Sequence, residues 1–122
     1  MKTPADPGRN LADPARILEH LGIDAWFADR EKTLAYVNAR SRRTREDIMA
    51  ALGKNVEGCH KRPESHEEIR VLYGQWEAGS TEVRLSSHDV EGGKKYNILI
   101  PVQGPDGFEG CLELAFTVKE EG

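Results

Sequence analysis

The fold is decided by residues 95–118, which read KYNILIPVQGPDGFEGCLELAFTV. Two apolar runs flank the turn-forming sequence Gly104-Pro105-Asp106-Gly107, and within each run side chains alternate with period two, as expected for paired β-strands. On the first run, one face carries Tyr96, Ile98, Ile100 and Val102; on the second, it carries Leu112, Leu114 and Phe116. The stretch therefore predicts a long β-hairpin with strands over residues 95–103 and 108–118.

Upstream of the hairpin the sequence predicts one more strand and the longest helix. The strand spans residues 81–90 and turns at 91–94, where two glycines suit a tight connection. The helix spans residues 66–78 and ends at Gly79, with Ser65-His66-Glu67-Glu68 resembling a capping box. Its apolar side chains recur at i, i+3, i+4 and i+7: Ile69, Leu72, Tyr73 and Trp76.

The first half of the chain predicts two short strands and three short helical segments. Residues 25–28 and 34–37 read as a β-hairpin. We expect helical segments over residues 14–21, 38–43 and 44–52, with Thr44 opening the last one and Gly53 closing it. Residues 53–64 read as a loop.

Composition indicates one soluble globular domain. The chain has 122 residues, of which 38% are hydrophobic and 31% charged, with a net charge of -4. This balance argues against nucleic acid as the main partner. No apolar run approaches the roughly 20 residues of a membrane span, and the N-terminal residues lack the apolar core of a secretory signal. We therefore expect a cytoplasmic protein in which Cys59 and Cys111 are free thiols.

The order of elements, with several local motifs, resembles the PAS domain. The resemblance covers residues 23–118 and includes the strand-ending segment 34–38, the Gly53-Lys54 pair after a helix, and the Asp106-Gly107 turn before Gly110. It implies an α+β fold, with a five-stranded antiparallel sheet and helices on one face, to which the sequence adds the N-terminal helix over residues 14–21. Residues 1–22 form an arm and short helix that we expect to contact a dimer partner, and residues 119–122 form a tail.

Within PAS domains, Gly58-Cys59-His60 and the nearby Pro63 resemble a bacterial subgroup with a Cys-His-Pro-Pro motif, although Lys61-Arg62 depart from that pattern. A thiolate or imidazole here is a candidate ligand for haem iron or another metal, with His60 the candidate metal ligand. The alternative is a packed cysteine and a hydrogen-bonded loop histidine. The flavin-binding pattern has Asn-Cys-Arg in this region, so a flavin is not expected.

The resemblance implies a small molecule or cofactor held between the helices and the sheet. The residues predicted to line that site are Cys59, His60, Tyr73, Trp76, Tyr36, Ile98 and Leu112. Aromatic side chains predicted for the same interior, able to pack a flat ligand or to fill the space themselves, are Trp26, Phe27, Tyr36, Tyr96 and Phe116.

Other polar clusters predict no chemistry. The arginines at positions 40, 42, 43 and 45 have acidic neighbours, so we interpret them as a solvated face. No phosphate loop or catalytic triad is recognisable, and we expect no enzyme activity. Two functions remain: a sensor that binds a ligand and signals to an output domain through a homodimer or partner contact, or an interaction module with a filled core and no ligand.

Overall fold

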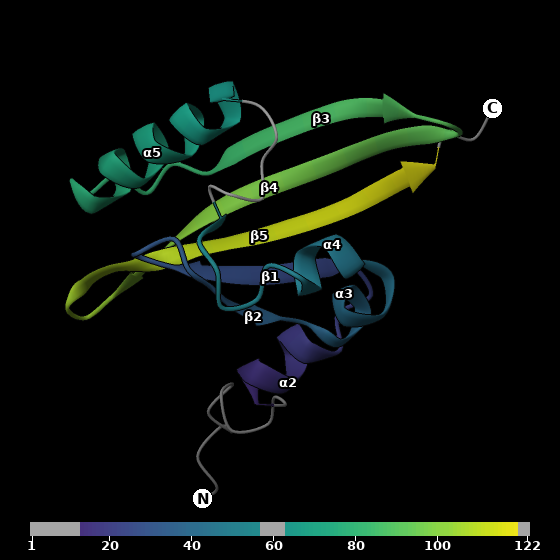
Figure 1. The fold of residues 1–122 in the computed structure, drawn as a ribbon, viewed down its shortest axis with the longest axis horizontal. Helices are drawn as coiled ribbons and strands as arrows, with labels where there is room; N and C mark the ends of the chain where they lie inside the picture. Colours follow the sequence, from purple (N-terminus) through teal and green to yellow (C-terminus); the bar gives the residue numbers. More distant parts are fainter. Residues whose placement is uncertain (1–12, 57–62, 120–122) are drawn as a thin grey trace, which may run out of the picture.

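A computed structural model describes residues 13–56 and 63–119 of the chain (Figure 1). Its helices and strands follow in this order: α2 (Pro14–Glu19), β1 (Asp24–Asp29), β2 (Leu34–Val37), α3 (Ala39–Thr44), α4 (Glu46–Met49), α5 (Pro63–Glu77), β3 (Arg84–Val90), β4 (Gly93–Gly104) and β5 (Gly107–Lys119). Within these residues, no helix has the length and apolar character needed to cross a bilayer.

The strands form one antiparallel sheet in the order β2-β1-β5-β4-β3. The β4–β5 hairpin is its longest part and turns between Gly104 and Gly107, as predicted. β1 pairs with the edge of β5 that β4 leaves unpaired, with Phe27 opposite Leu112. The first and last strands of the described chain are therefore neighbours in the middle of the sheet. The predicted five-stranded antiparallel α+β fold is confirmed.

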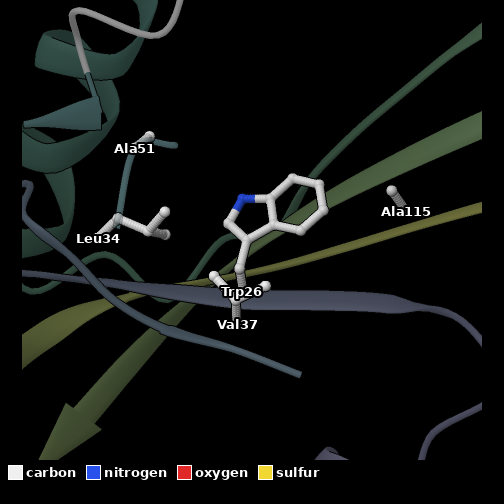
Figure 2. Close-up of a cluster of buried hydrophobic side chains, with 5 residues drawn as sticks. All are labelled: Trp26, Leu34, Val37, Ala51 and Ala115. Carbon is white, nitrogen blue, oxygen red and sulfur yellow. The ribbon is translucent and has the colours of Figure 1, made fainter. Parts of the chain in front are cut away.

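The sheet has an inner face, covered by α4 and α5, and an outer face, where α2 lies (Figure 1). Two groups of buried side chains attach the helices to the inner face. One contains Trp26, Leu34, Val37, Ala51 and Ala115, with Ile48 and Met49 of α4 packed against it. In Figure 2 the Trp26 ring extends across the sheet between Leu34 and Ala51 at one end and Ala115 at the other. The second group contains Tyr73, Trp76, Phe108 and Cys111.

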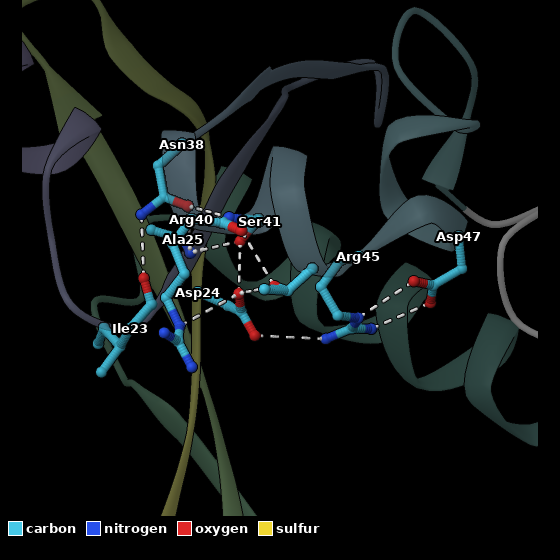
Figure 3. Close-up of polar contacts among 9 residues, drawn as sticks. Ile23, Asp24, Ala25, Asn38, Arg40, Ser41, Arg45 and Asp47 are labelled. Carbon is cyan, nitrogen blue, oxygen red and sulfur yellow. Dashed lines mark hydrogen bonds and ion pairs between the residues drawn. The ribbon is translucent and has the colours of Figure 1, made fainter.

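The chain between β2 and α4 is organised by one buried asparagine. Asn38 caps α3: its side-chain oxygen accepts hydrogen bonds from the backbone N–H groups of Ser41 at 3.1 Å and Ala25 at 3.3 Å. Its amide nitrogen donates to the carbonyl oxygen of Ile23 at 3.0 Å (Figure 3) and to that of Leu18 at 3.2 Å. One side chain therefore joins α2, the start of β1 and α3, satisfying polar groups that would otherwise be buried without partners.

Several predicted boundaries were wrong. The predicted helix over residues 44–52 is only Glu46–Met49, because Thr44 ends α3 instead of capping α4 and its hydroxyl bonds to Arg40 and Asp24. The helix predicted from residue 66 begins at Pro63, a residue that suits a first helical turn because it lacks the N–H that would go unpaired there. The strand predicted from residue 81 begins at Arg84.

Candidate ligand-binding cavity

A cavity of about 190 Å³ lies between the inner face of the sheet and helices α4 and α5. Its wall is mostly apolar, with a few polar groups that converge on it from different elements. The residues that line it are Trp26, Ala28, Leu34, Arg45, Asp47, Ile48, Val56, Ile69, Leu72, Tyr73, Trp76, Asn97, Leu99, Cys111 and Glu113.

Aromatic side chains fix the α5 side of the cavity. The ring of Tyr73 lies 5.8 Å from that of Trp76 and meets Phe108 edge-on at 5.4 Å, between centroids. The Trp76 indole N–H donates to the carbonyl oxygen of Glu82 at 2.9 Å, and the Tyr73 hydroxyl lies 3.4 Å from the carbonyl oxygen of Ala28. The polar ends of both rings are therefore satisfied, and the rings offer the cavity an apolar surface.

Arg45 enters the cavity wall from the bend between α3 and α4. Its guanidinium lies 5.2 Å from the centroid of the Trp26 ring and forms two hydrogen bonds to the Asp47 carboxylate, at 3.0 and 3.1 Å (Figure 3). Its Nη1 atom faces Asp24 at 3.8 Å. Hydrogen bonding to Arg45 lowers the pKa of Asp47, so this pair stays ionised at neutral pH.

Glu113 is a half-buried acidic group in this wall. It stands on β5 directly opposite Trp26 of β1 and Leu99 of β4. Burial raises the pKa of its carboxyl to about 7, and a hydrogen bond from the Trp26 side chain and the charges of Arg45 and Lys95 offset only part of that rise. Near neutral pH this carboxyl is therefore present in both its protonated and its ionised form.

Two further groups on the cavity wall remain neutral at pH 7. Burial raises the pKa of the Cys111 thiol to about 12, and it raises the pKa of the Tyr73 hydroxyl as well. Cys111 is a free thiol, as predicted.

In the described part of the chain, no group of three or more His, Cys, Asp or Glu side chains is arranged to hold a metal ion.

The five predicted ligand-site residues that the structure describes are divided between two places. Tyr73 and Trp76 line the cavity. Tyr36 and Leu112 line a separate apolar hollow on the outer face beneath α2, and Ile98 pairs with Leu114 on that same face. Cys59 and His60, including the predicted metal ligand, lie outside the described residues.

Strand alternation explains this division. Because Phe27 pairs with both Tyr36 and Leu112, these three side chains share one face, and the inner face carries the other set. Of the aromatic residues predicted for the interior, only Trp26 faces the cavity. Tyr96 stacks on Phe116 on the outer face, with ring centroids 5.4 Å apart.

Sequence reasoning missed Glu113, Asn97 and Arg45. It placed the face of β5 that carries Leu112, Leu114 and Phe116 toward the interior. Because neighbouring side chains on a strand point to opposite faces, Glu113 was then not a candidate for the site. One signal in the sequence pointed to the other face of these strands. That face carries the small buried residues Ala28, Cys111 and Ala115, and small side chains beneath a helix leave room for a cavity. Of the four arginines predicted to form a solvated face, those at positions 40, 42 and 43 are exposed, whereas Arg45 is half-buried and lines the cavity.

Comparison with known proteins identifies the architecture. No family model and no curated protein matches the sequence. Solved structures do match. A C-terminal domain from Streptococcus mutans aligns with a TM-score of 0.69 and 23% identity over 85% of this chain and 81% of that one. The PAS domain of Bordetella pertussis BvgS aligns with a TM-score of 0.63 and 18% identity over 87% and 84% of the two chains.

A sensory box sensor histidine kinase from Vibrio cholerae is similar to the same extent, with a TM-score of 0.61 and 18% identity over 88% of this chain and 90% of that chain. The three alignments cover 85% to 88% of this chain. The five strands, their order and the helical cover around an inner cavity are those of the PAS fold, and this chain has that fold.

Proposed function

We propose that this chain is a sensory domain that binds a small molecule in the inner cavity and passes the signal to a dimer or protein partner. The observation that carries the proposal is the cavity itself: about 190 Å³ of space, walled by apolar side chains, with Glu113, Asn97 and Arg45 converging on it. Apolar pockets with a few convergent polar groups are typical of ligand sites. PAS domains of sensor histidine kinases among the similar structures support a signalling role.

The size of the cavity favours a ligand of few heavy atoms. Its volume lies below the roughly 300 to 1,000 Å³ that pockets for drug-sized ligands enclose. A haem held through His60 remains the alternative that the sequence motif suggests, and that loop lies outside the described residues.

The route of the signal would run through α5. Near its C-terminal end this helix is held to the sheet by Tyr73 and Trp76, and Gln103 of β4 donates a hydrogen bond to the Trp76 carbonyl oxygen at 3.1 Å. Toward its N-terminal end an exposed ion pair joins Glu68 to Arg84 of β3 at 3.3 Å. A ligand beneath Ile69 and Leu72 would change the position of the more weakly held end, and a ligand shifts such an equilibrium only through its different affinity for the two positions.

We propose binding and not catalysis as the role of the site. The Arg45 guanidinium is engaged by Asp47, and Cys111 and Tyr73 remain protonated at neutral pH. These states supply neither a free nucleophile nor a matched acid–base pair.

The second candidate is a ligand-free interaction module. One observation favours it: apolar side chains are exposed on the β3 edge and the end of β5, with exposed fractions of 54% for Val83, 59% for Leu85 and 49% for Val118. Exposed apolar patches often mark protein contacts. In this case the surface would serve dimerisation, and the cavity would hold no specific ligand.

Native mass spectrometry of the purified protein, followed by thermal-shift screening of metabolites, tests the two candidates. Leu99→Trp fills the cavity, and Leu85→Trp adds the same ring at an exposed site as a control. The sensor proposal expects a retained mass or a stabilising metabolite in the wild type and in Leu85→Trp, and its loss in Leu99→Trp. If no compound distinguishes the two variants while Leu85→Asp dissociates a dimer, the interaction module is the correct function.

A further inference from the structure

The Glu113 carboxyl lies where the cavity meets a second hollow between α5 and β3. The two spaces share Ile69, Leu72, Asn97, Leu99 and Glu113 in their walls. The second hollow adds Glu68, Arg84 and Ser86, which lie toward the exposed side of β3. Glu113 is therefore accessible from a continuous space that reaches from the core to the edge of α5.

We propose that this site takes a small organic amine, bound as an ammonium ion with Glu113 as its counter-ion and the apolar wall around its hydrocarbon part. This inference rests on the proposed function, because it assigns a ligand class to the same cavity.

The charges in the wall favour a cation. The charge of Arg45 is matched by the Asp47 carboxylate at 3.0 Å and by Asp24 at 3.8 Å. Other charged or titratable groups around Glu113 are Lys95 on β4, Tyr73 on α5, Cys111 on β5, and the mutually paired Glu68 and Arg84 at the edge of the second hollow. Arg45 and Lys95 are the cations whose charges act on Glu113, yet neither forms an ion pair with it in the described part of the chain. When ionised, Glu113 therefore has no direct counter-ion there, and a monocation is its complement.

The polar atoms also match the donors of an ammonium group. A carboxylate can accept several hydrogen bonds, so Glu113 keeps acceptor capacity for an ammonium group with the Trp26 side chain beside it. Asn97 supplies a side-chain carbonyl from the neighbouring strand: Leu99 stands opposite Glu113 and Asn97 stands two residues away on the same face. Leu72, Trp76 and Leu99 provide an apolar wall for a short alkyl chain. An anionic ligand would meet the Glu113 charge, and the one buried donor without a hydrogen-bond partner among the described residues is Arg45 Nη1, whose charge faces Asp47 and Asp24.

The inference is tested by titrating ¹⁵N-labelled protein with three probes of one shape: n-butylamine, n-butanol and sodium butyrate. Amide shifts at Leu99, Glu113 and Leu72 report binding in the cavity. We expect n-butylamine at pH 8 to bind more tightly than either other probe, and Glu113→Gln to weaken it by roughly tenfold to a hundredfold, the range for hydrogen bonds to charged groups. Glu109→Gln removes the same charge from an exposed position on β5 and should leave the affinity unchanged.

The same titration at pH 6 gives an independent readout. Wild-type affinity for n-butylamine should fall because Glu113 takes up a proton, whereas the weak affinity of Glu113→Gln should not change with pH. Equal affinity for the amine in wild type and Glu113→Gln would overturn the inference. If butanol or butyrate binds the cavity better than the amine, the ligand class is wrong and the cavity remains a ligand site. If no probe shifts these amides, the amine assignment fails, and the metabolite screen decides the proposed function separately.

Discussion

Trp26 and Glu113 stand directly opposite one another on β1 and β5, with both side chains on the inner face of the sheet. The indole is one of the five buried side chains of the core beneath α4. It faces a carboxyl whose pKa is raised by burial and lowered in part by the Trp26 side chain. The sheet therefore places an ionisable group in the same layer as its hydrophobic core. This arrangement costs stability whenever the carboxyl is charged, and such a cost is typical of positions retained for a function.

The first prediction concerns the pH dependence of folding. The pKa of Glu113 is raised from 4.5 to about 7 in the folded chain, so between these values the folded state binds a proton that the unfolded state has released. The contribution of this group to the free energy of unfolding is present below pH 4.5 and is lost as pH rises to 7. The rise of the pKa from 4.5 to about 7 corresponds to roughly 3 kcal/mol of the free energy of unfolding.

Glu113→Gln should remove this dependence and be more stable than wild type at pH 8 by up to about that amount, with little difference at pH 4.5. Urea denaturation of both proteins at several pH values measures it. Glu109→Gln, on the exposed side of the same strand, should follow the wild-type curve. A Glu113→Gln protein that is less stable than wild type at pH 8 would contradict a raised pKa.

The second prediction concerns the buried asparagine before α3. Asn38→Ala removes the cap of α3 and leaves the carbonyl oxygens of Leu18 and Ile23 without their side-chain donor. Loss of a cap and burial of unpaired polar groups together should cost roughly 2 to 4 kcal/mol of the free energy of unfolding. Asn55→Ala, at an exposed position, should cost less than about 1 kcal/mol. Equal effects in chemical denaturation would show that the network around Asn38 does not stabilise the fold.

The third prediction concerns the close approach of β1 and β5. Gly110 has a φ of 151°, and a Cβ atom there would collide with the carbonyl oxygen of Ala28 and the ring of Phe27. Backbone strain and overpacking should make Gly110→Ala less stable by roughly 2 to 4 kcal/mol. Gly74→Ala is the matched control, because that Cβ enters open space within α5 and should stabilise the helix by about 0.5 to 1 kcal/mol. Thermal unfolding should therefore move in opposite directions for the two variants.

The sequence was sufficient for the architecture and insufficient for the site, and the reason is physical. Turn chemistry and the period-two alternation around residues 104–107 predict the β4–β5 hairpin without knowledge of its neighbours. Which face of a strand is buried depends on the strands and helices that it contacts, and the alternation of residues in one strand does not identify these. Both faces of β5 carry apolar residues, and the choice between them follows from its pairing with β1, where Phe27 aligns with Leu112. Because the other face was chosen, the predicted site contained Leu112, whereas the cavity of the structure contains Glu113.

The same limitation applies to the arginines near α3. Spacing alone predicted one exposed cluster, but the backbone bends at Arg45, between two helices that sequence reasoning had divided elsewhere. The bend sends this guanidinium over the Trp26 ring while Arg42 turns outward to Glu19. Helix boundaries of short segments depend on such tertiary contacts.

The last prediction concerns how α2 is attached to the sheet. The Glu19 carboxylate accepts two hydrogen bonds from Arg42, at 2.9 and 3.0 Å, and one from the Tyr36 hydroxyl at 3.1 Å. These groups are partly exposed to solvent, so Glu19→Gln should change the global free energy of unfolding by less than about 1 kcal/mol, and added salt should reduce the difference further.

A local measurement should respond more strongly, because α2 has only six residues and depends on its contacts to stay helical. Hydrogen exchange at the amides of Ile17 and His20, which donate to Asp13 and Arg16, should speed up in Glu19→Gln while amides in β5 keep their protection. Glu31→Gln changes an exposed residue away from α2 and serves as the control. If exchange in α2 is unchanged, the apolar contacts of Ala15 and Leu18 over Phe27 and Tyr36 hold the helix by themselves.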